Sequence, residues 1–205
     1  MSKSILDKPH LVLASSNLGK IKEFCRLLSD LPITVYGQPE GFQIEETGQT
    51  FVENARLKAL AVANATGQWS MADDSGLSVN VLSGAPGIHS ARFASTDEER
   101  IRRLLREMEP FEERSAHFTS AICIASPRDE VLLEVEGVCQ GLITKERRGN
   151  KGFGYDPIFE VLHTGLTFAE MGAEYKQALS HRGKAFKLLL PGLKKLLGLS
   201  VDLYN

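Results

Sequence analysis

The sequence predicts an α/β fold built on a mixed β-sheet. Apolar, strand-like runs alternate with helical patterns in the first half of the chain. In the second half, two long strand-like runs follow one another through a tight turn, as in an antiparallel hairpin. The 205 residues contain no internal repeat, low-complexity tract or linker-like segment, so we expect a single domain over residues 1–205.

Four elements are expected before the chain reaches its first acidic cluster: a buried strand at 10–14, a helix over about 19–30, a short strand at 33–36 and an Ala-rich helix ending near residue 65. "TFVE" is a capping box for the second helix, because the Thr50 hydroxyl and the Glu53 carboxylate can each bond the other's backbone N–H group. Gly67 follows as a stop signal. "WSMADDSG" at 69–76 then predicts a strand that ends in an acidic turn.

The second half opens with another capping box, "TDEE" at 96–99, before a helix with apolar residues at helical spacing. Residues 116–125 and 130–140 predict two strands joined through "SPRD", a favourable hairpin turn. Ser180 is expected to cap a terminal helix that Pro191–Gly192 interrupts.

Composition excludes several classes of function. A net charge of −2 argues against nucleic-acid binding through bulk electrostatics. The three cysteines form no C-x-x-C pair, and no His/Cys spacing suggests zinc. No apolar run approaches the roughly 18 residues of a membrane-spanning helix, and the N-terminus lacks a secretory signature. We therefore expect a cytoplasmic protein without membrane or nucleic-acid partners.

The stretch "LASSNLGK" at 13–20 is a candidate anion site. Ser15, Ser16, Asn17 and Gly19 join a strand to a helix whose first N–H groups and dipole favour negative charge, and a lysine follows. The alternative is an ordinary strand–helix turn capped by Ser16 or Asn17.

Acidic residues offer a second candidate site. Asp73 and Asp74 are adjacent at a strand, so their side chains should point to opposite sides of the sheet. Glu45, Glu46 and Glu53 cluster around the start of the Ala-rich helix. One or two carboxylates with phosphate oxygens and water are the ligands of Mg²⁺. The alternative is a turn with a capping aspartate and exposed glutamates.

Two later stretches suit a flat, polar ligand. In "GNKGFGYDPIF" at 149–159, glycines permit close approach, Phe153 or Tyr155 could stack on a base, and Asp156 could accept ring N–H groups. A flexible loop anchored by its aromatics is the alternative. "SHRGK" at 180–184 places cations at a helix start, where the dipole opposes them. A negative or carbonyl-rich ligand, or a nearby carboxylate, should therefore compensate these cations.

The order of these pieces carries more information than any one of them. The stretches "SSNLGKIKE", "ETGQTFVENARLKA", "ADDSGLSVNVLSGAPGIHSARF", "GFGYDPIF" and "SHRGKAFKLL" together resemble the inosine triphosphate pyrophosphatase family, from about Leu11 to Leu190. The resemblance implies the ITPase-like fold, in which two lobes surround a long mixed sheet with a central substrate cleft, and a homodimer. It also implies Mg²⁺-dependent hydrolysis of dITP, ITP and XTP to the monophosphate and pyrophosphate.

The resemblance also implies roles for individual residues. Asp74 matches the proton acceptor and a metal ligand, and Glu46, or its neighbour Glu45, matches the second metal carboxylate. Ser75 matches a substrate contact. The phosphate-holding positions are Ser15, Ser16, Asn17, Leu18, Gly19 and Lys20, and the other nucleotide-binding positions are Phe153, Gly154, Tyr155, Asp156, Lys176, His181 and Arg182. One departure is visible: the family commonly has glycine where this chain has Ser16.

Two alternative functions compete with this interpretation. A related pyrophosphatase could act on modified pyrimidine or 7-methylguanosine triphosphates. A nucleotide-binding sensor would lack catalysis, although the intact acidic stretch speaks against it, because a sensor does not need a poised carboxylate beside a metal.

Overall fold

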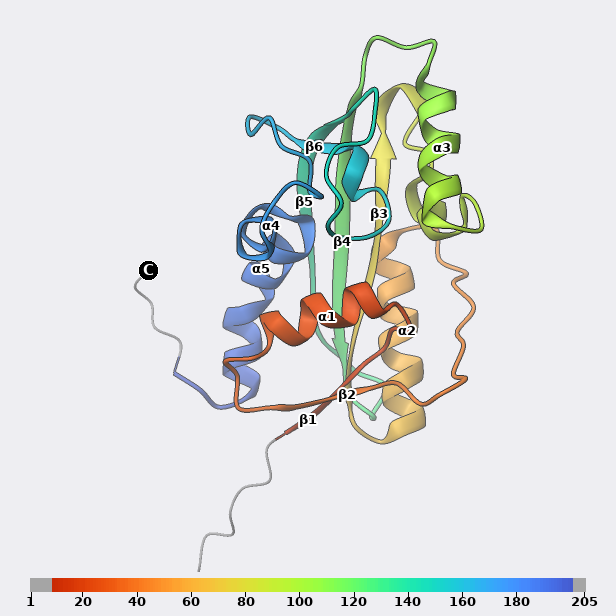
Figure 1. The fold of residues 1–205 in the computed structure, drawn as a ribbon. Coiled ribbons are helices and arrows are strands. Elements are labelled where there is room, and N and C mark those ends of the chain that lie inside the picture. Colours follow the sequence, from red (N-terminus) through yellow and green to blue (C-terminus); the bar gives the residue numbers. More distant parts are fainter. Residues whose placement is uncertain (1–8, 201–205) are drawn as a thin grey trace, which may run out of the picture.

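A six-stranded mixed sheet forms the centre of the molecule (Figure 1). The computed structural model describes residues 9–200, so the expected lack of a secretory signal concerns residues outside the described part. The strands are β1 (His10–Leu13), β2 (Thr34–Gly37), β3 (Trp69–Val79), β4 (Ser115–Ala125), β5 (Val131–Ile143) and β6 (Phe159–Val161). Their order is β2-β1-β3-β4-β5-β6, with parallel pairing among the first three and antiparallel pairing from β3 onward. The predicted α/β class and mixed sheet are confirmed.

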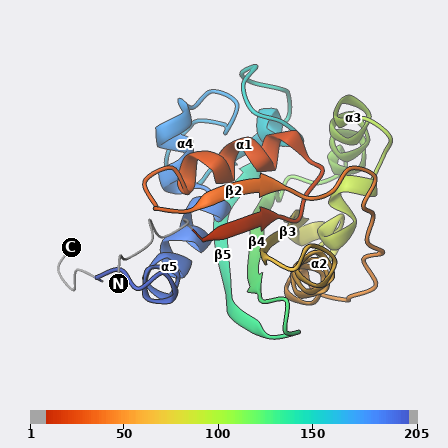
Figure 2. The ribbon, with the colours of Figure 1, turned by 90° about the horizontal axis from the view of Figure 1, so that it is seen from below.

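Helices cover both faces of this sheet (Figures 1 and 2). They are α1 (Leu18–Leu27), α2 (Phe51–Thr66), α3 (Asp97–Met108), α4 (Ala173–Leu179) and α5 (His181–Leu196), with 3₁₀ helices at Asn80–Leu82, Gly87–Arg92 and Asp156–Ile158. Because side chains alternate along β1, Leu11 and Leu13 pack against α1 and α5, whereas Val12 packs against α2. A third apolar cluster joins α3 to the far ends of β3, β4 and β5. The long strands therefore run through two lobes.

Most of the predicted elements are present. Both capping boxes form, at Thr50–Glu53 and at Thr96–Glu99, and Gly67 ends α2 in the left-handed conformation with φ +66°. The two strands joined by "SPRD" pair antiparallel. Helix α1 is shorter than expected because its C-cap is Leu28. The short elements α4 and β6 were not predicted.

The expected interruption of the last helix is wrong. Helix α5 continues through Pro191 to Leu196. Pro191 and the residue four positions earlier, Lys187, are both exposed, so the carbonyl that loses its partner can bond water. Buried Leu189 and Leu193, two residues before and after Pro191, hold the helix against the sheet. In the described part of the chain, no helix has the length and apolar character needed to cross a membrane.

Candidate active site

A cavity of about 740 Å³ lies between the lobes and collects residues from most of the predicted motifs. The turn between β1 and α1 borders it, with Ser15, Ser16, Asn17 and Lys20 in its lining. Asn17 is the helix cap: its side-chain oxygen accepts from the Lys20 backbone N–H at 3.1 Å. Leu18 is 81% exposed and does not line the cavity. Capping and anion binding are therefore compatible in this turn, because the cap satisfies one of several helix-end N–H groups.

The acidic stretch is not a turn, so that prediction is wrong. Asp73 and Asp74 lie in the middle of β3, which pairs with β1 on one side and β4 on the other. Gly76 serves close packing, because a Cβ there would lie 2.3 Å from the Gly87 carbonyl oxygen and 2.6 Å from Ser90 Oγ. The strand continues, and its alternation sends the two carboxylates to opposite faces as expected.

Asp73 is a structural anion held by cations from α1 and α5. Its carboxylate lies 2.8 Å from Lys20 Nζ and 3.4 Å from Arg182 Nε, and it also accepts from the Ser120 hydroxyl. Burial alone would raise the pKa of Asp73, but the two cations outweigh it and hold the pKa far below its ordinary value. Ser75 Oγ donates to the same carboxylate and accepts from Arg182 Nη2 at 2.7 Å.

Asp74 faces α2, where a lysine bridges it to a second carboxylate. Lys58 Nζ lies 2.7 Å from Asp74 Oδ1 and 2.8 Å from Glu46 Oε1. Asn54 donates to the other Asp74 oxygen, and Arg92 Nη2 lies 2.5 Å from Glu46 Oε2. Burial raises the pKa of Asp74, although Lys58 opposes the shift. Burial would also raise the pKa of Glu46, but Lys58 and Arg92 hold it below its ordinary value.

These carboxylates fit a divalent cation. One ammonium group contacts both, so Asp74 and Glu46 present oxygens that a single cation can reach. Glu45 is exposed and lies outside the cavity lining. Among residues 9–200 no cluster of three or more His, Cys, Asp or Glu side chains is arranged for a metal. Two carboxylates that leave room for phosphate oxygens and water suit Mg²⁺.

The Gly-rich segment holds its side chains more firmly than a flexible loop would. Asp156 is buried, and its carboxylate accepts from the Phe153 backbone N–H at 2.9 Å and from Lys176 Nζ at 2.6 Å. Tyr155 is also buried and donates its hydroxyl to the Ser90 carbonyl oxygen. Phe153 is half-buried and lines the large cavity, so of the two predicted aromatics it is the one available for stacking.

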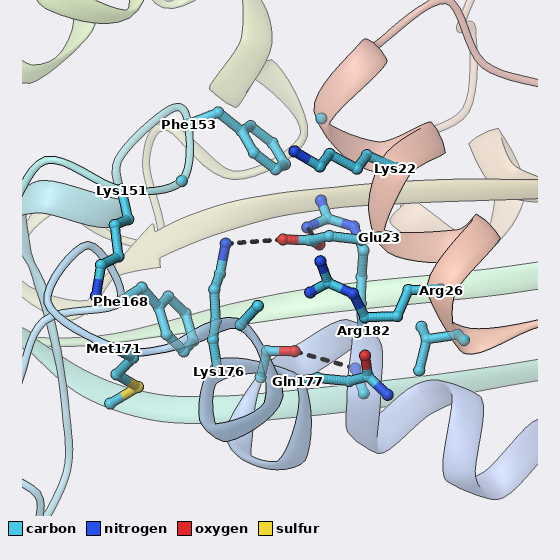
Figure 3. A pocket seen from close by; sticks show the side chains of 16 residues that line it. Lys22, Glu23, Arg26, Lys151, Phe153, Phe168, Met171, Lys176, Gln177 and Arg182 are labelled. Atoms are coloured by element: carbon cyan, nitrogen blue, oxygen red, sulfur yellow. Dashed lines mark hydrogen bonds and ion pairs between the residues drawn. The ribbon is translucent and has the colours of Figure 1, made fainter. Parts of the chain in front are cut away.

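A second cavity, of about 350 Å³, adjoins the first across Phe153 and Arg182 (Figure 3). Lys176 enters it from α4, and Glu23 of α1 bonds both Lys176 Nζ at 2.8 Å and Arg182 Nη1 at 2.9 Å. Glu23 and Asp73 are the carboxylates that compensate the Arg182 guanidinium at the start of α5, whereas Lys184 donates to the Val138 carbonyl oxygen. The second cavity therefore combines an aromatic wall with charged donors.

His181 is enclosed at the wall of the large cavity. Its ring stacks on Phe118 at 4.6 Å between centroids, and neither ring nitrogen has a hydrogen-bond partner within residues 9–200. Burial, with the Arg182 charge, lowers the pKa of His181 well below its ordinary value, so the imidazole is neutral.

Three charged residues that form ion pairs with predicted site residues were not themselves predicted from the sequence: Glu23, Lys58 and Arg92. A signal existed for Lys58, which lies four residues after Asn54 on the face of α2 that otherwise buries Ala55 and Ala59. A lysine on a buried, Ala-rich face indicates a carboxylate partner. For Glu23 and Arg92 no local signal exists, because their partners are distant in the sequence.

Comparisons with known proteins agree with this geometry. The Ham1 family model matches residues 11–192. The chain is 61% identical over 197 residues to a dITP/XTP pyrophosphatase of Prochlorococcus marinus (strain MIT 9313), covering 96% of this chain and 97% of that protein. It is 51% identical to a dITP/XTP pyrophosphatase of Gloeobacter violaceus, covering 90% and 94%. The solved HAM1 protein of Coxiella burnetii superposes with a TM-score of 0.83 at 44% identity, over 91% of this chain and 99% of that one. The chain belongs to the Ham1 family.

Proposed function

We propose that this protein hydrolyses dITP, ITP and XTP to the corresponding monophosphate and pyrophosphate, which removes deaminated purines from the nucleotide pool. The observation that carries the proposal is the pair Asp74 and Glu46, brought onto one cation beside a helix N-terminus and Lys20. Relatives of about 60% identity named dITP/XTP pyrophosphatase favour this function over a pyrophosphatase for modified pyrimidine or 7-methylguanosine triphosphates, and over a sensor.

Phosphates are the proposed ligands of the β1–α1 turn. Helix N–H groups and Lys20 offset negative charge there, and Asp73 fixes the lysine ammonium. Asp74 and Glu46 would hold Mg²⁺, which neutralises phosphate charge and polarises the phosphoryl group. EDTA treatment followed by addition of Mg²⁺, Mn²⁺ or Ca²⁺ tests this choice of ion, and activity restored fully by Ca²⁺ alone would contradict it.

Asp74 is the proposed proton acceptor. A water oxygen forms a bond to the α-phosphorus while the bond to the oxygen bridging the α- and β-phosphates breaks, and that electron pair leaves with pyrophosphate. The proton lost by the water passes to the Asp74 carboxylate and then to solvent. A pKa raised by burial strengthens this carboxylate as a base.

The base is proposed to enter the second cavity and to stack on Phe153. The 6-oxo group of hypoxanthine or xanthine would accept from Arg182 or Lys176, with nearby backbone completing the polar wall, and His181 would contact the nucleotide from the adjoining large cavity. Adenine carries an amino donor at that position and would leave these buried donors unpaired. Unpaired buried groups reject a ligand by orders of magnitude.

A panel of nucleoside triphosphates, assayed separately for pyrophosphate and orthophosphate, tests the proposed function. We expect pyrophosphate from dITP, ITP and XTP and much less from dATP, dUTP or methylated guanosine triphosphate. Orthophosphate as the first product, or equal turnover of dATP and dITP, would contradict it. The homodimer that the family resemblance implies is proposed as well, and sedimentation equilibrium tests it.

A further inference from the structure

Arg92 is the most exposed of the cationic side chains that line the large cavity. Five cationic side chains line it: Lys20, Lys58, Arg92, Arg100 and Arg182. The Arg92 side chain is 55% exposed, whereas the other four lie between 6% and 20%. Arg92 ends the 3₁₀ helix that packs on β3, so its backbone is anchored while its side chain reaches into the cavity.

Within residues 9–200, the Arg92 side chain bonds one partner, which leaves most of its N–H donors available. One nitrogen, Nη2, lies on Glu46 Oε2, and a guanidinium carries five N–H donors in a planar fork. Arg100, in contrast, bonds Asp97 Oδ1 through Nη1 and the Ala94 carbonyl through Nε. Arg92 can therefore keep its contact with Glu46 and donate to a second anion at the same time.

The position of Arg92 indicates which anion this is. β3 sends Asp73 toward Lys20 and Arg182, and sends Asp74 toward Lys58, which also contacts Glu46, the partner of Arg92. Arg92 thus contacts one of the two proposed metal carboxylates in the cavity that the β1–α1 turn borders, and it does not line the second cavity proposed for the base. A nucleoside triphosphate carries about four negative charges at neutral pH. An arginine fork suits phosphate oxygens better than a lysine does.

We propose that Arg92 binds the β- and γ-phosphates and stabilises them as they leave as pyrophosphate. Glu46 orients the guanidinium through Nη2, and the remaining N–H groups donate to phosphate oxygens. The inference rests on the proposed function, because it assigns Arg92 to the leaving group of that reaction.

Direct binding of the two products tests this assignment without turnover. Isothermal titration calorimetry with Mg²⁺ measures the affinity for inorganic pyrophosphate and, separately, for dIMP. Arg92→Ala should weaken pyrophosphate binding about tenfold to a hundredfold, the range of a charged hydrogen bond, and leave dIMP binding unchanged. Arg92→Lys should fall between. Arg102→Ala is the matched control, since Arg102 is 72% exposed and pairs with Glu98 on α3, away from the cavity lining.

Three results would overturn the inference. The first is wild-type pyrophosphate affinity in Arg92→Ala, and the second is an equal loss of dIMP affinity. The third is a pyrophosphate defect that disappears at saturating Mg²⁺, which would mean that Arg92 acts only by orienting Glu46. Wild-type protein that releases no pyrophosphate from dITP would overturn the proposed function and this inference together, whereas active wild type with any of the three results overturns this inference alone.

Discussion

Replacing Lys58 with methionine separates the electrostatic role of its ammonium group from the packing of its methylene stem. Lys58 is 12% exposed and lies between Asp74 and Glu46, which are 9% and 24% exposed. In Lys58→Met the two carboxylates have no cation between them. Removing one partner of a buried ion pair costs about 3–5 kcal/mol. Because Glu46 is partly exposed and keeps Arg92, we expect about 3 kcal/mol without metal, or about 6–12 °C in the unfolding midpoint.

A divalent cation should reverse this loss. In the wild type, Lys58 already contacts both carboxylates, so a metal competes with it. In the variant no ammonium group competes, and binding to the native state alone adds stability. Mg²⁺ should therefore stabilise Lys58→Met more than the wild type and recover most of the deficit.

Thermal and urea unfolding in EDTA and in Mg²⁺, at pH 8, measure both effects. Lys187→Met on the exposed side of α5 is the control and should change the free energy of unfolding by less than about 0.5 kcal/mol. Equal stability of wild type and Lys58→Met in EDTA would refute the reasoning, and so would an equal gain from Mg²⁺ in both proteins.

Three further predictions concern single residues. Asp74→Asn should remain folded and lower kcat for dITP about 10²- to 10⁴-fold, measured as pyrophosphate release at saturating Mg²⁺; near-normal turnover would exclude Asp74 as the proton acceptor. Arg182→Lys should narrow the ratio of kcat/KM for dITP over dATP at least tenfold, and an equal loss on both would refute base selection by Arg182. Burial lowers the pKa of His181, so below about pH 6.5 the unfolded chain takes up a proton that the native state does not. The free energy of unfolding therefore decreases as the pH is lowered, by up to about 1.4 kcal/mol per pH unit. His181→Phe should remove this component, seen as a smaller loss between pH 7.5 and 5.5 in urea unfolding; the same pH dependence in both proteins would contradict it.

Local signals in the sequence predicted much of the fold. Capping boxes and the Gly67 stop depend on contacts within three or four residues, so they can be recognised without the tertiary structure. The predicted turn at the acidic stretch was wrong because contacts distant in the sequence decide its structure. Asp, Ser and Gly favour turns in isolation, but the antiparallel pairing of these residues with β4 and the cations on both faces outweigh that preference.

The candidate site shows the same division. The β1–α1 turn is contiguous and could be proposed from its own residues, whereas the partners of Lys176 could not. Lys176 bonds Glu23, which lies 153 residues earlier, and no pattern in one sequence reports such a pairing. The choice of Glu46 over Glu45 depends likewise on where the segment before α2 lies against Lys58.

The two aspartates of β3 have a consequence for motion. They are covalent neighbours in a strand that pairs with β4 at both positions, so no hinge separates the acid facing Lys58 from the acid facing Arg182. Opening and closing around a nucleotide therefore cannot change the spacing between these two carboxylates. Any movement that opens or closes the cavity therefore has to occur in the segments around β3. These are helix α1, the segment leading into α2, and the glycine-rich segment, which is bonded to α3 through the Gly154 backbone N–H and Asp97. Amide hydrogen exchange should accordingly be slowest in β3 and β4 and fastest in those surrounding segments.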